Sequence, residues 1–126
     1  MTRIYVAGPM TGYPRWNFDA FAEATEKLRA AGYEVVSPAE NDLALGFDPD
    51  APVEDFTEDD YTEALQRDLE IIQTVDAIAL LPGWHRSRGA NVEVRLAKML
   101  GLPVSTVGLF QKLAAQGKTP ERTTAI

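Results

Sequence analysis

Four short runs of apolar residues, rich in valine and isoleucine, divide the chain. They cover residues 3–7, 33–37, 75–81 and 102–107, and most are bounded by glycine or proline. Runs of this length and composition predict β-strands. The run at 75–81 is apolar except for Asp76, which is the pattern of a strand buried on both faces of a parallel sheet.

The segments between these runs have apolar residues at the spacing of an α-helix. A first helix is predicted from Asn17, a suitable N-cap, to Gly32, a suitable C-terminal stop. A second begins at residue 59 or 60, where aspartates suit a first helical turn, and a third covers 89–100. The apolar faces contain Phe18, Phe21, Leu28 and Ala31 in the first helix and Tyr61, Leu65, Leu69 and Ile72 in the second.

Strand and helix alternate along the chain, which predicts a parallel sheet covered by helices on both faces. The expected fold class is therefore α/β, a doubly wound, Rossmann-like sheet in a three-layer α/β/α sandwich. Ligands of such folds bind at the carboxyl ends of the strands. The loops at 8–16, from 38 onward and at 82–89 follow three of these ends, so we expect them to converge on one crevice.

Two segments lack a sustained helical period. Residues 38–59 contain three prolines and many acidic side chains, and we interpret them as a long surface loop, either a lid or an oligomer contact. Residues 108–126 are expected to begin as a short helix and to fray from Lys118 onward. The main domain is accordingly predicted to cover residues 1–107.

Composition indicates an ordinary globular domain. The chain has 126 residues, 45% hydrophobic and 25% charged, which suffices for one core. No cysteine is present, so disulfide and thiolate chemistry are excluded. No window approaches the roughly 20 apolar residues of a membrane span, and the N-terminal run is too short for a signal peptide, so we expect a cytoplasmic protein. A net charge of -7 disfavours a nucleic acid polymer but allows a small anion in a local basic pocket.

Residues 80–93 combine an apolar run, a glycine-containing polar loop and the start of a helix. Exposed amides and the helix dipole at such a start stabilise negative charge. Ser87, Arg88 and Gly89 add a hydroxyl, a guanidinium and a flexible backbone before Glu93, which we place in the opening helical turn. We interpret the segment as an anion and sugar site, although a glutamate in a first turn is also ordinary capping chemistry.

Asp68 falls on the apolar face of the second predicted helix, beside Leu65 and Ile72. A buried, unpaired charge is costly or raises its pKa until it is neutral, so Asp68 either pairs with an arginine or belongs to a functional cavity. Cleavage at an anomeric carbon requires two carboxyl groups in different settings. Glu93 and Asp68 are the candidates for such a pair, and the sequence leaves their separation open.

Other familiar chemistry is disfavoured by the motifs. Residues 8–12 lack the glycine spacing of a dinucleotide fingerprint and the lysine of a P-loop, although their amides remain candidate phosphate contacts. His85 is the only histidine and no cluster has metal-ligand spacing, so neither a metal nor another cofactor is expected. Trp16 and Trp84 are candidates either to stack on a base or to pack against the loops.

Several stretches together are similar to a known family. They are residues 4–12 (Ile-Tyr-Val-Ala-Gly-Pro-Met-Thr-Gly), 35–40, 67–76 and 81–93. Over residues 3–107 the chain resembles the DUF4406 family of bacterial and phage proteins and, more remotely, the nucleoside 2-deoxyribosyltransferases and the 2'-deoxynucleoside 5'-monophosphate N-hydrolases. The resemblance implies a flavodoxin-like sheet, a homodimer or higher homo-oligomer, and a cofactor-free enzyme that cleaves an N-glycosidic bond.

The resemblance also implies roles for individual residues. Glu93, in the motif Gly-x-x-x-Glu, is the nucleophile, Tyr5 orients it, and Asp68 contacts the sugar or assists the departing base. Ser87 stands where the transferases have an aspartate and the monophosphate hydrolases a serine, which favours a nucleotide substrate. The other implied substrate contacts are Gly8, Pro9, Met10, Trp84, Arg88, Gly89 and Asn91.

The leading hypothesis is therefore cleavage of the N-glycosidic bond of a (deoxy)nucleoside 5'-monophosphate or a related nucleotide, by hydrolysis or deoxyribosyl transfer. One alternative is a nucleotide-binding or sensing module without turnover. Another is a structural or interaction protein whose acidic segment, residues 42–60, contacts a partner.

Overall fold

The computed structural model describes residues 1–123 and has the predicted α/β architecture. Its parallel strands β1 (Arg3–Ala7), β2 (Glu34–Val36), β3 (Ala77–Leu80) and β4 (Val104–Thr106) follow the order β2-β1-β3-β4. This is the start of the flavodoxin-like order. The helices are α1 (Phe18–Ala30), α2 (Pro38–Ala44), α3 (Glu58–Ile72), α4 (Arg88–Met99) and α5 (Val107–Ala115), with 3₁₀ turns η1 (Pro14–Asn17), η2 (Val53–Asp55) and η3 (Trp84–Arg86). None of the helices within residues 1–123 has both the length and the hydropathy needed to cross a membrane.

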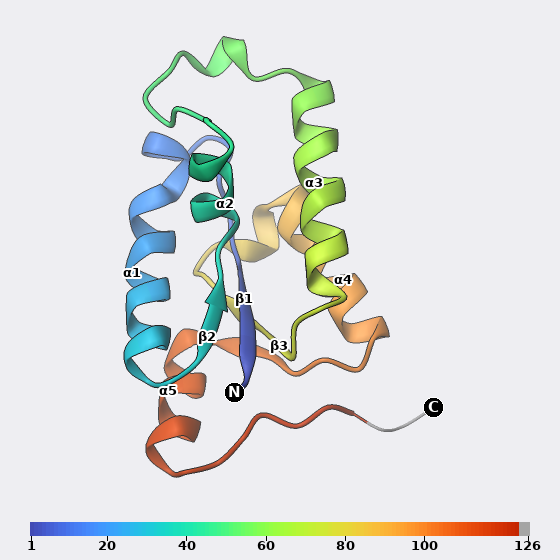
Figure 1. Cartoon of the computed structure of the whole chain (residues 1–126). Helices are drawn as coiled ribbons and strands as arrows, with labels where there is room; N and C mark the ends of the chain where they lie inside the picture. The colour runs from blue at the N-terminus through green and yellow to red at the C-terminus, as the bar shows by residue number, and fades with distance from the viewer. Residues whose placement is uncertain (124–126) are drawn as a thin grey trace.

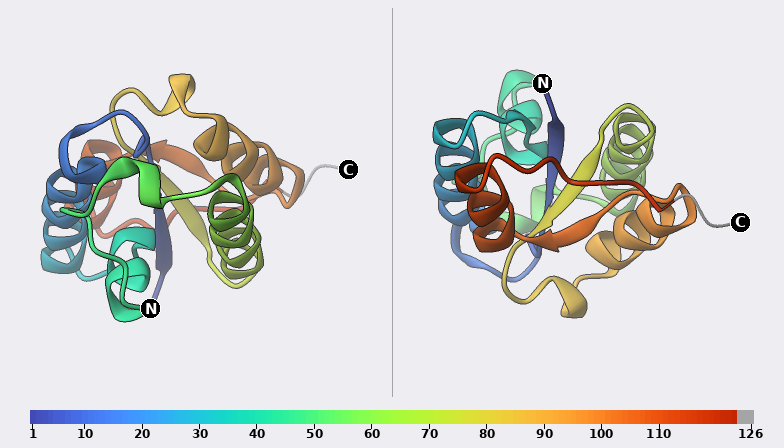
Figure 2. Two further views of the ribbon diagram at one scale, coloured as in Figure 1. Left: turned by 90° about the horizontal axis from the view of Figure 1, so that it is seen from above. Right: turned by 90° about the horizontal axis from the view of Figure 1, so that it is seen from below.

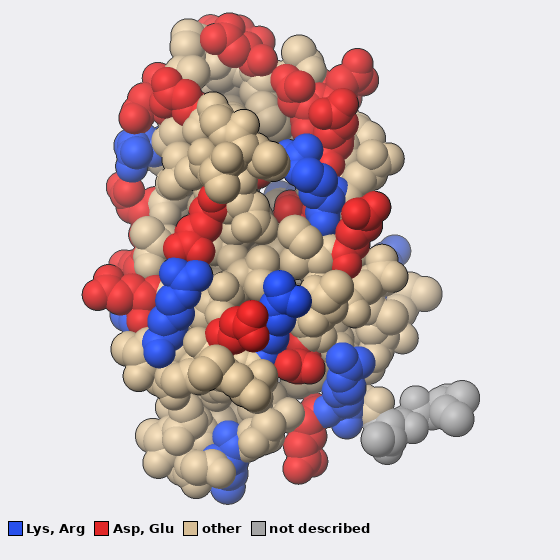
Figure 3. All heavy atoms as spheres, in the orientation of Figure 1, with Lys and Arg blue, Asp and Glu red and all other residues tan. Residues whose placement is uncertain are grey.

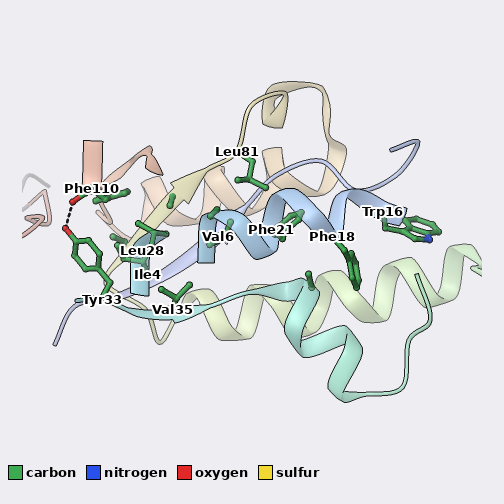
Figure 4. Close-up of a cluster of buried hydrophobic side chains, with 14 residues drawn as sticks. Ile4, Val6, Trp16, Phe18, Phe21, Leu28, Tyr33, Val35, Leu81 and Phe110 are labelled. Atoms are coloured by element: carbon green, nitrogen blue, oxygen red, sulfur yellow. Dashed lines mark hydrogen bonds between the residues drawn. The ribbon is translucent and has the colours of Figure 1, made fainter. Parts of the chain in front are cut away.

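The sheet lies between two helical layers, with α1 and α5 on one face and α3 and α4 on the other (Figures 1 and 2). Side chains alternate along a strand, so Ile4 of β1 enters the α1 and α5 core while its neighbour Tyr5 enters the α3 and α4 core. Figure 4 shows the first core, where the Tyr33 hydroxyl donates a hydrogen bond of 2.7 Å to the Phe110 carbonyl. The predicted three-layer sandwich is confirmed.

Residues 38–59 do not form the single long loop predicted from the sequence. The hydroxyl of Ser37 accepts a hydrogen bond from the Glu40 amide at 3.5 Å and caps α2. Pro38 is the first residue of the helix, a position that its restricted φ suits. Only residues 45–57 are irregular apart from η2. The prediction was wrong because Pro38 both ends a strand and begins a helix.

The turn before α1 contains unusual backbone geometry. Arg15, Trp16 and Asn17 have positive φ values of 49°, 56° and 63°, a region that costs roughly 1–2 kcal/mol for each non-glycine residue. The sequence predicted that the Asn17 side chain caps α1, and this was wrong. The side-chain amide donates instead to the Pro9 carbonyl at 2.9 Å. Arg15 pairs with Asp50 at 2.8 Å, so two tertiary contacts support the strained turn.

The chain after α5 passes beneath the sheet (Figure 2, right). Arg122 donates to the Val75 carbonyl at 3.2 Å, and the Thr123 amide donates to the Gly101 carbonyl at 2.8 Å. The part of the expected frayed tail that the structure describes is thus anchored by long-range hydrogen bonds. Residues 124–126 of that expected tail lie outside the described residues.

Candidate active site

A cavity lies at the carboxyl end of the sheet, where the predicted loops converge. We call it the inner cavity, and its volume is about 80 Å³. Backbone and side chains from the loop after β1, from α2, from α3 and from the start of α4 form its walls. The polar side chains in the lining belong to Thr11, Asp42, Tyr61, Asp68, Ser87 and Glu93, and the largely apolar aromatic side chains are Trp16, Phe18, Phe21, Phe47 and Phe56.

Tyr5 and Glu93 form the buried centre of the site. Tyr5 is fully buried in the central strand β1, and its hydroxyl donates a short hydrogen bond to Oε2 of Glu93. Glu93 is 5% exposed and lies in the second turn of α4, because the helix begins at Arg88. The predicted position in the opening turn was therefore wrong, and a tyrosine hydroxyl, rather than helix capping, holds the carboxyl group.

Asp68 faces the same cavity from α3, and burial changes the acidity of all three groups. Burial raises the pKa of Glu93 well above its usual value, and the charge of Asp68 raises it further. Burial likewise raises the pKa of Tyr5 and raises that of Asp68 to about 7. Tyr5 therefore keeps its proton as a donor to Glu93, and the state in which both Asp68 and Glu93 are ionised is disfavoured, so the two carboxyl groups share a proton.

Asp42 is a cavity residue that the sequence prediction missed. It lies on α2, its pKa is raised to about 6 by burial, and its ion pair with Arg67 at 4.0 Å acts in the opposite direction. Its position three residues after the buried Ala39 places it on the inward face of α2. The signal was the Ser-Pro-x-Glu helix start at residues 37–40, which would have turned the expected loop into a helix.

Three aromatic side chains cover the inner cavity. Trp16 lies with its ring centroid 5.7 Å from that of Phe47 and 5.0 Å from that of Phe56, and the two phenylalanine rings are 5.8 Å apart. Trp16 thus packs against loop side chains, as one of the two sequence interpretations predicted, and it also lines the cavity, whereas its stacking on a base stays a prediction. Small-molecule sites usually measure about 300–1,000 Å³, which is several times the volume of the inner cavity. A ligand that fills such a site must therefore extend out of the inner cavity or displace this aromatic cover.

A wider hollow of about 540 Å³, which we call the mouth, adjoins the inner cavity. Met10, Ser87 and Gly89 line both. The Ser87 hydroxyl accepts a hydrogen bond from the Ala90 amide at 3.1 Å and so caps α4, while its own hydrogen remains available to a ligand. Of the other predicted contacts, Gly8 lines the inner cavity, whereas Pro9 and Arg88 line the mouth.

Two predicted substrate contacts lie elsewhere. Trp84 lines a separate hollow of about 600 Å³ together with Lys27 and Thr106. The side-chain amide of Asn91 donates to the carbonyls of His85 and Ser87 at 2.9 Å and 2.8 Å, so it supports the loop instead of lining the cavity. Within residues 1–123 no group of three or more histidine or carboxylate side chains is arranged to hold a metal ion.

Fold and site together define a flavodoxin-like α/β protein with a buried tyrosine and a carboxyl pair at the carboxyl end of the sheet. The chain belongs to the family described as Domain of unknown function (DUF4406), whose profile matches residues 2–106. The structure is similar to that of the 2-deoxyribosyltransferase from the psychrotolerant bacterium Bacillus psychrosaccharolyticus, with 28% sequence identity and a TM-score of 0.59 over 82% of this chain and 72% of that one. No curated protein matches the chain. The predicted family, its relation to the deoxyribosyltransferases and the fold class are confirmed.

Proposed function

We propose that this protein cleaves the N-glycosidic bond of a 2'-deoxynucleoside 5'-monophosphate or a related nucleoside. The observation that carries the proposal is the hydrogen bond from the buried Tyr5 to Glu93, whose side chain lines a cavity together with that of Asp68. The similarity to a 2-deoxyribosyltransferase supports the class of reaction. In this proposal Glu93 is the nucleophile, Tyr5 a positioning residue and Asp68 the proton donor.

The first step forms a bond between Glu93 and the sugar. In the reactive form the one proton shared by the carboxyl pair lies on Asp68, and Glu93 is ionised. Tyr5 donates to Oε2, so Oε1 of Glu93 attacks C1' as the bond from C1' to the base nitrogen breaks. The electron pair of that bond leaves with the base, which takes a proton from Asp68. A carboxyl group with a pKa of about 7 is well matched to this transfer near neutral pH.

The second step releases the sugar. Water attacks C1', its proton passes to Asp68, and the bond from C1' to Glu93 breaks to restore the carboxylate. If a second base attacks in place of water, the outcome is deoxyribosyl transfer. Neither version requires a redox reagent, because only protons and electron pairs move.

The mouth is the proposed phosphate subsite. Ser87 offers a hydroxyl hydrogen, and Arg88 supplies positive charge. Gly89 has no side chain, so a phosphate in the mouth can approach the backbone at the start of α4. The aromatic cover faces the inner cavity, where it offers surfaces on which a base can stack.

The experiment is incubation with a panel of deoxynucleosides and their 5'-monophosphates, with chromatography to detect free base. We expect Glu93→Gln to lower base release by at least about 10³-fold, because the amide keeps the shape but cannot act as the nucleophile. Glu70→Gln, at an exposed position of α3, is the matched control and should retain the wild-type rate. Base release by Glu93→Gln at the wild-type rate, or none by the wild type, would rule out the proposal.

The small inner cavity beside a wide mouth favours a second candidate, a nucleotide-binding module without turnover, in which a nucleotide occupies the mouth and its sugar stays outside the cavity that contains Glu93. Calorimetric binding of a monophosphate without base release would support that candidate. The preference for a monophosphate, the homo-oligomeric state and the cytoplasmic location stay predictions. Sedimentation of the intact chain tests the oligomeric state.

A further inference from the structure

The starts of α3 and α4 meet at the mouth through three side chains. Glu58 is the first residue of α3 and Arg88 the first residue of α4. An Arg88 terminal nitrogen donates to the Glu58 carboxylate at 2.9 Å, and its Nε donates to the Tyr61 hydroxyl at 3.4 Å. The guanidinium carbon also lies 4.5 Å from the centroid of the Tyr61 ring. We call Glu58, Tyr61 and Arg88 the rim clasp.

The rim clasp decides what an anion meets on entering the mouth. The charged side chains that line the mouth are Arg86, Arg88 and Glu58. An incoming phosphate is attracted by the two guanidinium groups, but a carboxylate already bonds to Arg88. Acidic side chains also gather around this end of the molecule, where segment 45–57 and the start of α3 lie (Figure 3).

We propose that Glu58 is a specificity-determining residue, because its carboxylate competes with a 5'-phosphate for the Arg88 guanidinium and is displaced when the phosphate binds there. The rim clasp thereby sets how strongly the site prefers a monophosphate over a free nucleoside. This inference rests on the proposed function, since it concerns the substrate class of the same site.

The geometry makes this displacement feasible. The side chains of Glu58 and Arg88 are 76% and 68% exposed, so water solvates both partners when they separate. Tyr61 holds the guanidinium independently of Glu58, which keeps Arg88 at the mouth after the exchange. Ser87 and Gly89 line both hollows, so a phosphate at the rim clasp lies next to the cavity that contains Glu93.

The test measures binding of inorganic phosphate by calorimetry at low ionic strength. Glu58→Gln should tighten the dissociation constant about two- to fivefold, the range expected when an exposed ion pair stops competing. Asp59→Asn is the matched control, because it removes the same charge from the adjacent exposed position without the contact to Arg88, and it should shift binding by less than about 1.5-fold. In an Arg88→Gln background the effect of Glu58→Gln should disappear.

The same variants are then compared in catalysis. Glu58→Gln should lower the KM for a deoxynucleoside 5'-monophosphate about two- to fivefold while the KM for the matching deoxynucleoside shifts by less than about 1.5-fold. Equal effects of Glu58→Gln and Asp59→Asn, an effect that persists without Arg88, or no phosphate binding by any variant would each overturn the inference. Base release that depends on Glu93 would still stand in those cases. Tighter phosphate binding by Glu58→Gln without any base release would support the rim clasp and remove only the proposed reaction.

Discussion

The inner cavity and the rim clasp each contain a glutamate, and the two glutamates differ in exposure and in hydrogen-bond partner. Glu93 is 5% exposed and bonds to the uncharged hydroxyl of Tyr5, whereas Glu58 is 76% exposed and bonds to the guanidinium of Arg88. The hydrogen-bond partner of Glu93 carries no positive charge, and burial raises the pKa of Glu93. Burial therefore creates a proton-sharing pair with Asp68, while exposure leaves Glu58 in a weak ion pair that a ligand can replace.

This difference assigns bond cleavage to the inner cavity and the choice of substrate to the rim clasp in the proposed function. Reacting groups need fixed positions and shifted acidity, which a packed and dry setting supplies. A phosphate contact needs charge that stays accessible, which a solvated rim supplies. Changes inside should therefore alter kcat and pH dependence, and changes at the rim should alter KM and salt dependence.

Tyr5→Phe should have the largest effect within this comparison. It removes the donor to Oε2 of Glu93, so kcat should fall by about 10²-fold. The free energy of unfolding should also fall by about 1–3 kcal/mol, because a buried carboxyl group loses its partner. Steady-state kinetics and urea denaturation measure the two effects.

Tyr33→Phe is the matched control for this variant. It removes the hydroxyl that bonds to the Phe110 carbonyl in the opposite core, so it should change stability but leave kcat within about twofold. A similar loss of kcat in both variants would mean that Tyr5 acts through folding alone.

Asp68→Asn should change the pH profile of the reaction. Asp68 has a pKa of about 7 and donates its proton in the proposed first step, so wild-type kcat should fall above about pH 7. The variant should have about a tenfold lower kcat at pH 6 and should lack this alkaline limb. Initial rates between pH 5 and about 9 measure the profile. An unchanged limb in the variant would assign the proton to another group.

The same substitution should stabilise the protein at alkaline pH. Burial raises the pKa of Asp68 from 3.8 to about 7, so the folded state holds more protons than the unfolded state between these values. The contribution of Asp68 to stability therefore falls as pH rises through this window. Asp68→Asn should exceed the wild type by about 1–2 kcal/mol at pH 8, with a smaller difference at pH 4. Urea denaturation at both pH values checks this, and a larger gain at pH 4 would contradict it.

Salt should produce the smallest effect and act only at the rim. Between about 0.05 M and 0.5 M salt, the KM for a monophosphate should rise about two- to fivefold, because exposed charges are screened. The wild-type kcat should change by less than about twofold, since the reacting groups are buried. The matching deoxynucleoside is the control substrate. A kcat that falls as steeply as the affinity would show that the two regions are not separate.

The sequence by itself determined the layers of the fold. Continuous apolar runs and helical periods report burial locally, so the strands and the three long helices could be predicted from neighbouring residues. Asp68 was recognisable for the same reason, because a carboxylate on an apolar helical face is anomalous. Residues 4–7 are all buried, so the sequence of β1 does not tell which face of the sheet Tyr5 enters, and the packed structure shows that it faces α3 and α4.

Only the tertiary structure decided which side chains meet. Tyr5 and Glu93 are 88 positions apart, and Glu58 and Arg88 are 30 apart, so no local period relates either pair. Trp16, in a strained turn, packs on Phe47 and Phe56, which lie in a segment without apolar periodicity. The aromatic cover could therefore not be predicted from the sequence pattern. Periodicity reports which face of an element is buried, but the packing of separate elements sets the acidity of Glu93 and the partner of Arg88.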